Sequence, residues 1–365
     1  MPYFRLSGFF REGEFRFGNQ IFALSLAVKP RILVIRFSSI GDIVLTSPVV
    51  RALKLQLDAE VHYLTKSSYV SILETNPYVD HIHTLEDDLD LVISQLKRID
   101  FSHIVDLHNN IRTWRVKQAL GGSSTQLDKL NWQKWLLVNT KVNRMPDLHI
   151  VDRYLDTVRS LGVFNDGKGL DYFVPKGEEV GLKRLVKELT GQHIRWRQGF
   201  TALAIGAAHA TKRMPYDLLE SICRGIHGPI MILGGPGDIE VGAALEAATR
   251  AEVVNLSGQL SLHGSASVVA QSSMVVTPDT GMMHIAAAFK KPIVSVWGNT
   301  VPAFGMYPYY PEGMDQHVAF EVSGLSCRPC SKIGFASCPK KHFRCMQDQS
   351  VDLIVQAANR RFEEV

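Results

Sequence analysis

Short, continuously apolar runs alternate with segments of helical periodicity between Arg31 and His108. The apolar runs cover residues 31–37, 60–65, 81–85 and 103–108, and the helical segments cover residues 47–57, 68–76 and 88–99. Apolar strands without polar alternation are typical of a parallel sheet that is covered on both faces. The pattern therefore predicts a doubly wound α/β domain.

The same pattern begins again in the second half of the chain, after a less regular stretch at 121–145 and a helical segment at 149–163. Apolar runs cover residues 200–207, 230–235, 253–258, 274–279 and 292–298, and helical segments cover residues 215–226, 240–248 and 281–289. The economical prediction is an α/β protein of two doubly wound, Rossmann-like domains that face each other across a cleft.

We expect four parts along the chain. They are a weakly structured leader at 1–30, a first domain at 31–175, a second domain at 176–349 that opens with a linker and helix at 176–198, and a C-terminal helix at 350–365 that packs back on the first domain. Phe and Arg interleave in the leader, so a membrane-surface anchor is the alternative interpretation of that part.

Composition narrows the class of protein. With 45% hydrophobic and 21% charged residues the chain is globular, and its net charge of +4 is too small for non-specific nucleic-acid binding, although a local anionic ligand fits. No stretch reaches the roughly 18 apolar residues of a membrane-spanning helix. The apolar run at 21–28 is short for a signal peptide and follows Glu12 and Glu14, so we expect a cytoplasmic protein.

The first candidate site is the strand-to-helix junction RFSSIGDIVLTSP, at the edge of the first sheet where doubly wound proteins bind ligands. Gly41 permits a tight turn or a close ligand approach, and Asp42 either projects its carboxylate into the cleft or caps the following helix. The junction has no GxGxxG, which disfavours a Rossmann oxidoreductase or epimerase.

Two further candidates lie in the second half. In GAAHATKRMP, Lys212 and Arg213 either bind a phosphate or form a solvated surface. In TPDTGMMHIAAAF, Asp279 or Thr280 ends an apolar strand and caps a helix that begins at Gly281, so free amides and the helix dipole converge where an anion would bind. His284 alone would be a structural histidine, but a helix cap does not explain the whole motif.

Four of the five cysteines fall in one short segment, whereas Cys223 lies in a predicted helix and is expected to be core. The clustered residues are Cys327, Cys330, Cys338 and Cys345. The Cys-x-x-Cys start supports half of a structural zinc site, and reduced thiols without a metal are the alternative.

The motifs RILVIRFSSIGDIVLTSPVVRALK, VDLHNNIRT, GAAHATKRMP, ILGGPGDIE, NLSGQLSL and PDTGMMHIAAAFKKPIVSVWGNT follow one another in the chain. In this order the chain resembles the lipopolysaccharide heptosyltransferases of glycosyltransferase family 9 over about residues 31–361. The resemblance implies a GT-B fold with an N-terminal domain for a lipid-linked core oligosaccharide acceptor and a C-terminal domain for ADP-heptose. It also implies peripheral contact with the cytoplasmic face of the inner membrane.

The resemblance assigns roles to single residues by motif. It implies a catalytic carboxylate at Asp42, a diphosphate-binding Lys212, and a donor-binding helix start formed by Asp279, Thr280, Gly281 and His284. It further implies nucleoside contact by Glu240 and acceptor contact by Arg112 and His108.

The chemistry expected of such a site is an inverting transfer, in which Asp42 takes the proton of the acceptor hydroxyl while Lys212 and the helix start stabilise the departing diphosphate. No DxD pair lies near the donor loop, so we expect a metal-independent reaction that requires no cofactor. The alternatives are another nucleotide sugar or acceptor within the same family, and a non-catalytic nucleotide-sugar binding protein.

Overall fold

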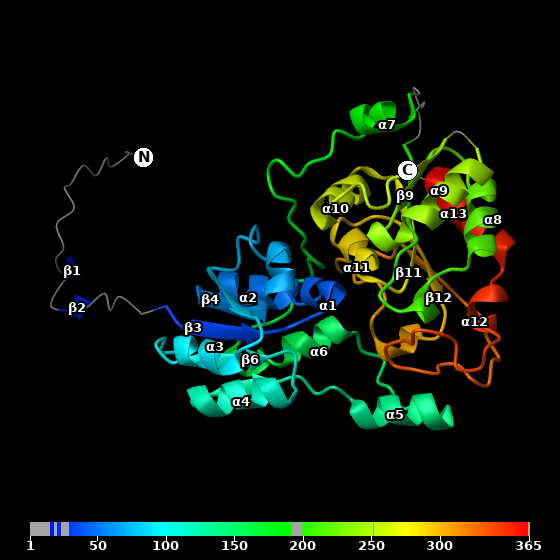
Figure 1. The fold of residues 1–365 in the computed structure, drawn as a ribbon. Coiled ribbons are helices and arrows are strands. Elements are labelled where there is room, and N and C mark those ends of the chain that lie inside the picture. Colours follow the sequence, from blue (N-terminus) through cyan, green and yellow to red (C-terminus); the bar gives the residue numbers. More distant parts are fainter. Residues whose placement is uncertain (1–14, 18–19, 23–28, 192–198, 251, 364–365) are drawn as a thin grey trace, which may run out of the picture.

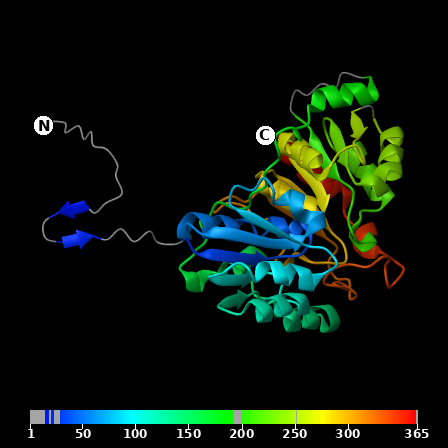
Figure 2. The same cartoon turned by 60° about the vertical axis from the view of Figure 1, so that its left-hand side comes forward.

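The computed structural model describes residues 15–17, 20–22, 29–191, 199–250 and 252–363. Two lobes lie side by side, and each is built on a parallel sheet with helices on both faces (Figure 1). Figure 2 shows the sheet of the first lobe beside the second lobe. The two predicted doubly wound domains are confirmed.

The first sheet has the strand order β5-β4-β3-β6-β7. Its strands are β3 (Arg31–Ile35), β4 (Glu60–Lys66), β5 (His81–Leu85), β6 (His103–Asp106) and β7 (Ser124–Gln126). Apolar side chains of β3 and β4 enter two different cores, because successive side chains of a strand point to opposite faces. One core includes α2 (Ser47–Leu57) and α6 (Ile150–Asp156), and the other includes α3 (Leu89–Leu96) and α4 (Ile111–Leu120).

The second sheet has the order β10-β9-β8-β11-β12-β13. Its strands are β8 (Thr201–Ala204), β9 (Ile230–Leu233), β10 (Val253–Asn255), β11 (Met274–Pro278), β12 (Ile293–Trp297) and β13 (His317–Glu321). One face packs against α8 (Tyr216–Gly225), α9 (Ile239–Ala248) and α13 (Val351–Glu363), and the other against α10 (Leu262–Gln271) and α11 (Gly281–Ala288).

The remaining helices are short or connect the lobes. They are α1 (Ile40–Val44), α5 (Asn131–Thr140), α7 (Leu182–Thr190), α12 (Arg344–Gln347) and the 3-10 helices η1 (Ser67–Ile72), η2 (Arg159–Leu161), η3 (Ala210–Lys212), η4 (Pro236–Asp238) and η5 (Pro302–Phe304). Among the helices in the described ranges, none combines the length and the apolar character that crossing a membrane requires.

The C-terminal helix corrects one expectation. We predicted that it packs back on the first domain, but α13 packs against α8, β11 and β12 of the second lobe. Ile354 and Ala358 are fully buried in the core that α8 shares with the second sheet. Gly225 makes this approach possible, because a Cβ atom there would lie 2.8 Å from the methyl groups of Val355.

Several local predictions also differ from the structure. The helix expected at 68–76 is the 3-10 helix η1 followed by turns. The less regular stretch at 121–145 contains β7 and α5, and Leu137 of α5 is buried against Val301 and Phe304 of the second lobe. In the leader, β1 (Phe15–Phe17) pairs with β2 (Gln20–Phe22) in an antiparallel hairpin, and the rest of 1–28 lies outside the described residues.

Candidate active site

Asp42 lies in the first turn of α1, directly after the carboxyl end of β3. Its Oδ2 accepts hydrogen bonds from the backbone N–H of Ser39 at 3.1 Å and from the Ser39 hydroxyl at 2.8 Å. Ser39, not Asp42, is the N-cap residue of α1. The carboxylate reaches back to the cap residue, so Asp42 is the N3 residue of a capping box and not the N-cap residue of the alternative interpretation.

Arg36 holds the other oxygen of the carboxylate. Its Nη2 lies 2.6 Å from Asp42 Oδ1, while its Nε and Nη1 donate to the carbonyls of Ser38 and Leu107 at 2.8 and 2.7 Å. Burial favours a higher pKa for Asp42, but the Arg36 charge and the hydrogen bonds from Ser39 outweigh it and hold the pKa below its ordinary value. The carboxylate is therefore ionised at neutral pH.

Arg36 was not among the candidates from sequence. A charged residue that interrupts an apolar strand run at its carboxyl end, as in RILVIRF, is the signal that points to it. The guanidinium is a positioning group, because it fixes the orientation of the Asp42 side chain.

The two lobes meet where α1 packs against α11 (Figure 1). A Cβ atom at Gly41 would lie 2.6 Å from Cδ2 of His284 and 3.3 Å from Cα of Gly281. A Cβ atom at Gly281 would lie 2.9 Å from Cγ2 of Ile40. Both glycines are needed for this close approach, which brings the helix that carries Asp42 onto the first turn of α11.

The start of α11 has the features of an anion site. Thr280 is the N-cap residue and makes no side-chain cap hydrogen bond, so the first-turn amides and the positive end of the helix dipole face the junction. His284 is buried, and burial lowers its pKa to about 4, so its imidazole is neutral near pH 7.

Lys212 reaches the same place from η3, which follows β8. Its Nζ lies 2.6 Å from Oδ2 of Asp279, an oxygen that also accepts a 2.7 Å hydrogen bond from the Thr300 hydroxyl. The structure thus brings together Asp42, Lys212, Asp279, Thr280, Gly281 and His284. The neighbouring Arg213 turns away, because its Nη1 pairs with Asp238 at 3.1 Å.

His108 and Arg112 lie on the first-lobe side of the site, around one aromatic ring. The Phe37 ring centroid is 5.0 Å from the ring of His108, and the Arg112 guanidinium lies 5.3 Å from that centroid. Burial, followed by the positive charges of Arg36 and Lys129, lowers the pKa of His108 to about 4. Glu240 is exposed in the first turn of α9, which follows β9. Strand β8 lies between β9 and β11 in the sheet, so Glu240 follows a strand that is not adjacent to the strand that precedes α11.

Further basic side chains influence the electrostatics around Asp42, and sequence reasoning missed them. They are Lys129, Lys134, Arg153 and Lys332. Burial, and after it the charges of Arg153 and Lys332, lower the pKa of Lys134 to about 8. Lys134 lies on α5 and Lys332 in the cysteine-rich segment, so both halves of the chain contribute to this basic group.

The cysteine-rich segment braces the donor side of the site. Arg328 donates to the carbonyls of Gly298 and Thr300 at 2.6 and 2.8 Å, and the N–H of Phe335 donates to the Thr211 hydroxyl at 2.8 Å. All four cysteines are free thiols, and Cys327 Sγ lies 3.8 Å from His342 Nε2. Across the described residues, one group places three metal-ligating atoms within 4.8 Å of one another, and it contains no cysteine. The four cysteines nevertheless act on one another electrostatically, because, after burial, the charges of Cys327 and Cys338 favour a higher pKa for Cys330 and those of Cys330, Cys338 and Cys327 do the same for Cys345. The zinc site and the metal-free thiols both stay predictions.

Two lobes that are each built on a parallel sheet and meet where α1 packs against α11 have the architecture of the GT-B fold class. Residues 92–334 match glycosyltransferase family 9 (heptosyltransferase), and the chain belongs to this family. The predicted family, fold class and enzyme class are confirmed, and the chain is a glycosyltransferase.

Relatives and solved structures agree with this assignment. Lipopolysaccharide heptosyltransferase 1 of Campylobacter coli is 22% identical over 296 residues, which span 74% of this chain and 84% of that protein. A family 9 glycosyl transferase from Veillonella parvula superposes with a TM-score of 0.73 at 18% identity, over 93% of this chain and 100% of that one. The E. coli ADP-heptose LPS heptosyltransferase II superposes with a TM-score of 0.66 at 19% identity, over 92% and 99%.

Proposed function

We propose that this glycosyltransferase moves a heptosyl group from ADP-heptose to the lipid-linked inner core of lipopolysaccharide, with inversion and without a metal ion. The observation that supports the proposal is the contact of α1 with the start of α11, because it brings the helix that carries Asp42 next to the first turn of α11. The names of the relatives supply the sugar and the acceptor.

The reaction is a single displacement. The oxygen of the acceptor hydroxyl attacks the anomeric carbon of the heptose, and its proton passes to the Asp42 carboxylate. The bond between the anomeric carbon and the diphosphate oxygen breaks, and its electron pair leaves with ADP. The acceptor oxygen attacks from the side opposite the leaving group, and this single displacement inverts the anomeric centre.

The leaving diphosphate is held by fixed positive groups of the chain. The amides at the start of α11 and the Lys212 ammonium offer donors to the diphosphate oxygens as negative charge develops on them. Asp279 pairs with Lys212 at 2.6 Å and keeps the ammonium at this position. A metal-independent reaction follows from these groups, because they supply the charge that a divalent ion supplies in other glycosyltransferases.

The basic group around Asp42 selects an anionic acceptor. Lys129, Lys134, Arg153 and Lys332 come from three parts of the chain yet act on one region. A phosphorylated or carboxylated core sugar would be attracted to this region and oriented toward the carboxylate.

A membrane-facing surface accompanies the acceptor side. Trp132 and Trp135 of α5 stack with a centroid separation of 5.4 Å, and their side chains are 65% and 51% exposed. Exposed tryptophans beside basic residues are typical of proteins that lie on the headgroup layer. We therefore propose peripheral contact with the cytoplasmic face of the inner membrane through α5.

The experiment measures ADP binding by thermal shift in the presence of a chelator. ADP should raise the melting temperature without a divalent ion. The Lys212→Ala variant should lose one charge-assisted hydrogen bond of about 1.5–3 kcal/mol, so its dissociation constant for ADP should rise about 10- to 100-fold.

The matched control is Arg213→Ala, which removes an adjacent positive charge that is held by Asp238. It should bind ADP nearly as the wild type does. Stabilisation that appears only with Mg²⁺ or Mn²⁺ would contradict the metal-free mechanism, and an unchanged ADP affinity in Lys212→Ala would contradict the role of Lys212. Acceptor-dependent ADP release from ADP-heptose then tests the transfer itself.

A further inference from the structure

A histidine-rich cluster lies at the far end of the first sheet from the candidate active site. Glu60 and His62 alternate along β4, and His81 and His83 alternate along β5, so all four lie on one face of the sheet. In the register of these parallel strands His62 pairs with His81, and Glu60 pairs with Arg31, the first residue of β3. Asp42 follows the opposite, carboxyl end of β3.

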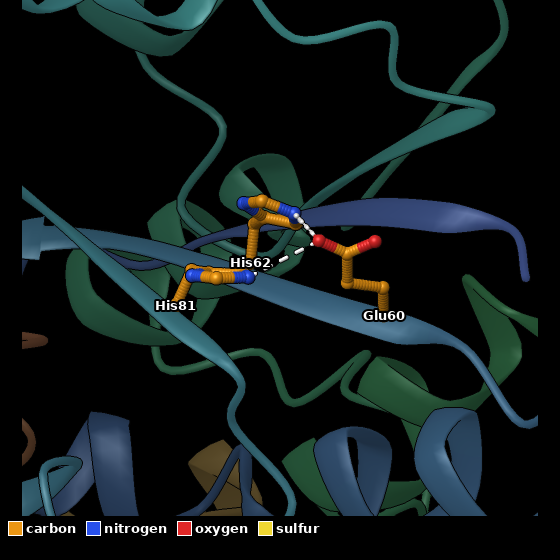
Figure 3. A group of neighbouring side chains, drawn as sticks. All are labelled: Glu60, His62 and His81. Carbon is orange, nitrogen blue, oxygen red and sulfur yellow. Dashed lines mark hydrogen bonds and ion pairs between the residues drawn. The ribbon is translucent and has the colours of Figure 1, made fainter.

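The Nε2 atoms of two of these histidines, His62 and His81, are both directed at the Glu60 carboxylate (Figure 3). Oε1 of Glu60 lies 3.3 Å from Nε2 of His62 and 3.1 Å from Nε2 of His81. All three atoms lie within 4.8 Å of one another. In a tetrahedral zinc site with bonds of about 2.0–2.1 Å, neighbouring ligand atoms are about 3.3–3.4 Å apart. The two distances to Glu60 are already close to this value.

The surrounding contacts hold the three ligands in place. Nε of Arg31 binds the other oxygen of Glu60 at 3.1 Å and leaves Oε1 to the histidines. Nδ1 of His62 hydrogen-bonds Nε2 of His83 at 2.9 Å, which fixes the ring so that Nε2 faces Glu60. Metal-binding histidines usually have such a partner on their second nitrogen. The His62 ring also packs edge-on against Phe101, with centroids 5.1 Å apart.

Solvent reaches the cluster from one side. The His62 side chain is 4% exposed, whereas that of His81 is 52% exposed and lies on the edge strand β5. An ion can therefore enter past His81.

We propose that Glu60, His62 and His81 bind one divalent transition-metal ion, with Zn²⁺ as the best match to two imidazoles and a carboxylate. The ion replaces the hydrogen bonds between the carboxylate and the two rings and ties the edge strand β5 to β4. Its position at the amino end of the strands separates it from the transfer reaction, so the site is structural. The proposal is independent of the function proposed above.

The test uses the full chain, stripped of metal with a chelator and titrated with Zn²⁺. Binding is measured by competition with a chromophoric chelator, and the ring nitrogens of the histidines are followed by ¹⁵N NMR. The wild type should bind Zn²⁺ with shifts at Nε2 of His62 and His81. His81→Ala should weaken this binding at least about 10-fold, since the loss of even an outer partner of a metal ligand costs that much.

Two further variants test whether Zn²⁺ binds at this cluster and not elsewhere in the chain. Glu60→Gln removes the charged ligand and should also weaken binding, which tests the site without relying on one histidine. Cys330→Ser is the control for zinc bound by the cysteine-rich segment and should leave the His62 and His81 shifts unchanged. Equal Zn²⁺ affinity in the wild type, His81→Ala and Glu60→Gln overturns the proposal. Absence of ring-nitrogen shifts at His62 and His81 in the wild type overturns it as well.

Discussion

Replacing Asp42 by Asn separates the catalytic role of the carboxylate from its structural role. The change keeps the shape of the side chain but removes the charge, and one oxygen becomes an amide nitrogen. Oδ1 of the Asn side chain can still accept hydrogen bonds from Ser39. The amide nitrogen then faces the Arg36 guanidinium, so two hydrogen-bond donors stand opposite each other in place of the 2.6 Å ion pair. A folded Asp42→Asn protein should therefore be less stable than the wild type.

The expected loss of stability and the expected loss of rate decide how the result is interpreted. Arg36 keeps its two carbonyl partners, so the stability cost is about one hydrogen bond to a charged group, about 1.5–3 kcal/mol. Loss of a general base costs about 10²- to 10⁴-fold in rate, or about 3–5.5 kcal/mol. For a protein with at least about 5 kcal/mol of stability, the variant stays about 95% folded or more at 25 °C. Unfolding cannot account for a loss of two orders of magnitude.

The assay is acceptor-dependent ADP release at 25 °C, together with thermal unfolding of the same samples. The matched control is Asp106→Asn, since Asp106 is also buried at the carboxyl edge of the first sheet and pairs with Lys117 at 3.0 Å. Asp106→Asn should lose stability but retain turnover. The catalytic assignment of Asp42 is refuted if Asp42→Asn keeps more than about a third of native turnover, or if Asp106→Asn loses as much as Asp42→Asn.

The pH dependence gives an internal check. Because the folded pKa of Asp42 lies below its ordinary value near 3.9, the carboxylate adds stability at pH values above about 4. This contribution is lost as the pH falls through the folded pKa. The difference in unfolding free energy between the wild type and Asp42→Asn should therefore shrink below about pH 4. A difference that stays constant down to that range would contradict the ion pair with Arg36.

Two other predictions rest on packing and on exposure. Gly41→Ala places a methyl group 2.6 Å from the His284 ring and should cost about 1–3 kcal/mol of overpacking with a lower kcat. Gly181→Ala, with open space around it, should cost only the difference between a Gly and an Ala N-cap of α7, about 1 kcal/mol or less, and should leave turnover unchanged. Normal kcat in Gly41→Ala would contradict the need for close contact between the lobes. The double variant Trp132→Ala and Trp135→Ala should bind anionic vesicles more weakly in a sedimentation assay while transfer to a soluble acceptor is unchanged, and undiminished vesicle binding would show that α5 is not the contact surface.

The sequence by itself determined the fold class and most strands of both sheets. A strand that is buried on both faces must be apolar along its whole length, and that requirement is readable without the structure. The edge strands β7 and β13 escaped prediction because they are short or partly exposed and carry polar residues. The motif residues Asp42, Lys212 and Gly281 were also evident, since each follows the carboxyl end of a predicted strand.

Contacts between distant segments were decided only by the tertiary structure. The position of the Arg36 guanidinium beside Asp42 depends on its hydrogen bond to the Leu107 carbonyl, after the end of β6. The packing of α5 on Phe304 depends on how the two lobes are placed relative to each other. The position of α13 depends on a glycine that is more than a hundred residues away in the chain. Periodicity reports which face of an element is apolar, but it does not report which partner covers that face.

The cluster of Glu60, His62 and His81 likewise depends in part on the sequence and in part on the tertiary structure. The alternation E-x-H and H-x-H is visible in the sequence, and it places each pair on one face of a strand. Only the pairing of β4 with β5 and the register of His62 opposite His81 bring the ligand atoms within 4.8 Å of one another. A shift of the register by one residue would turn the histidines of β5 to the opposite face of the sheet, because strand side chains alternate with a period of two.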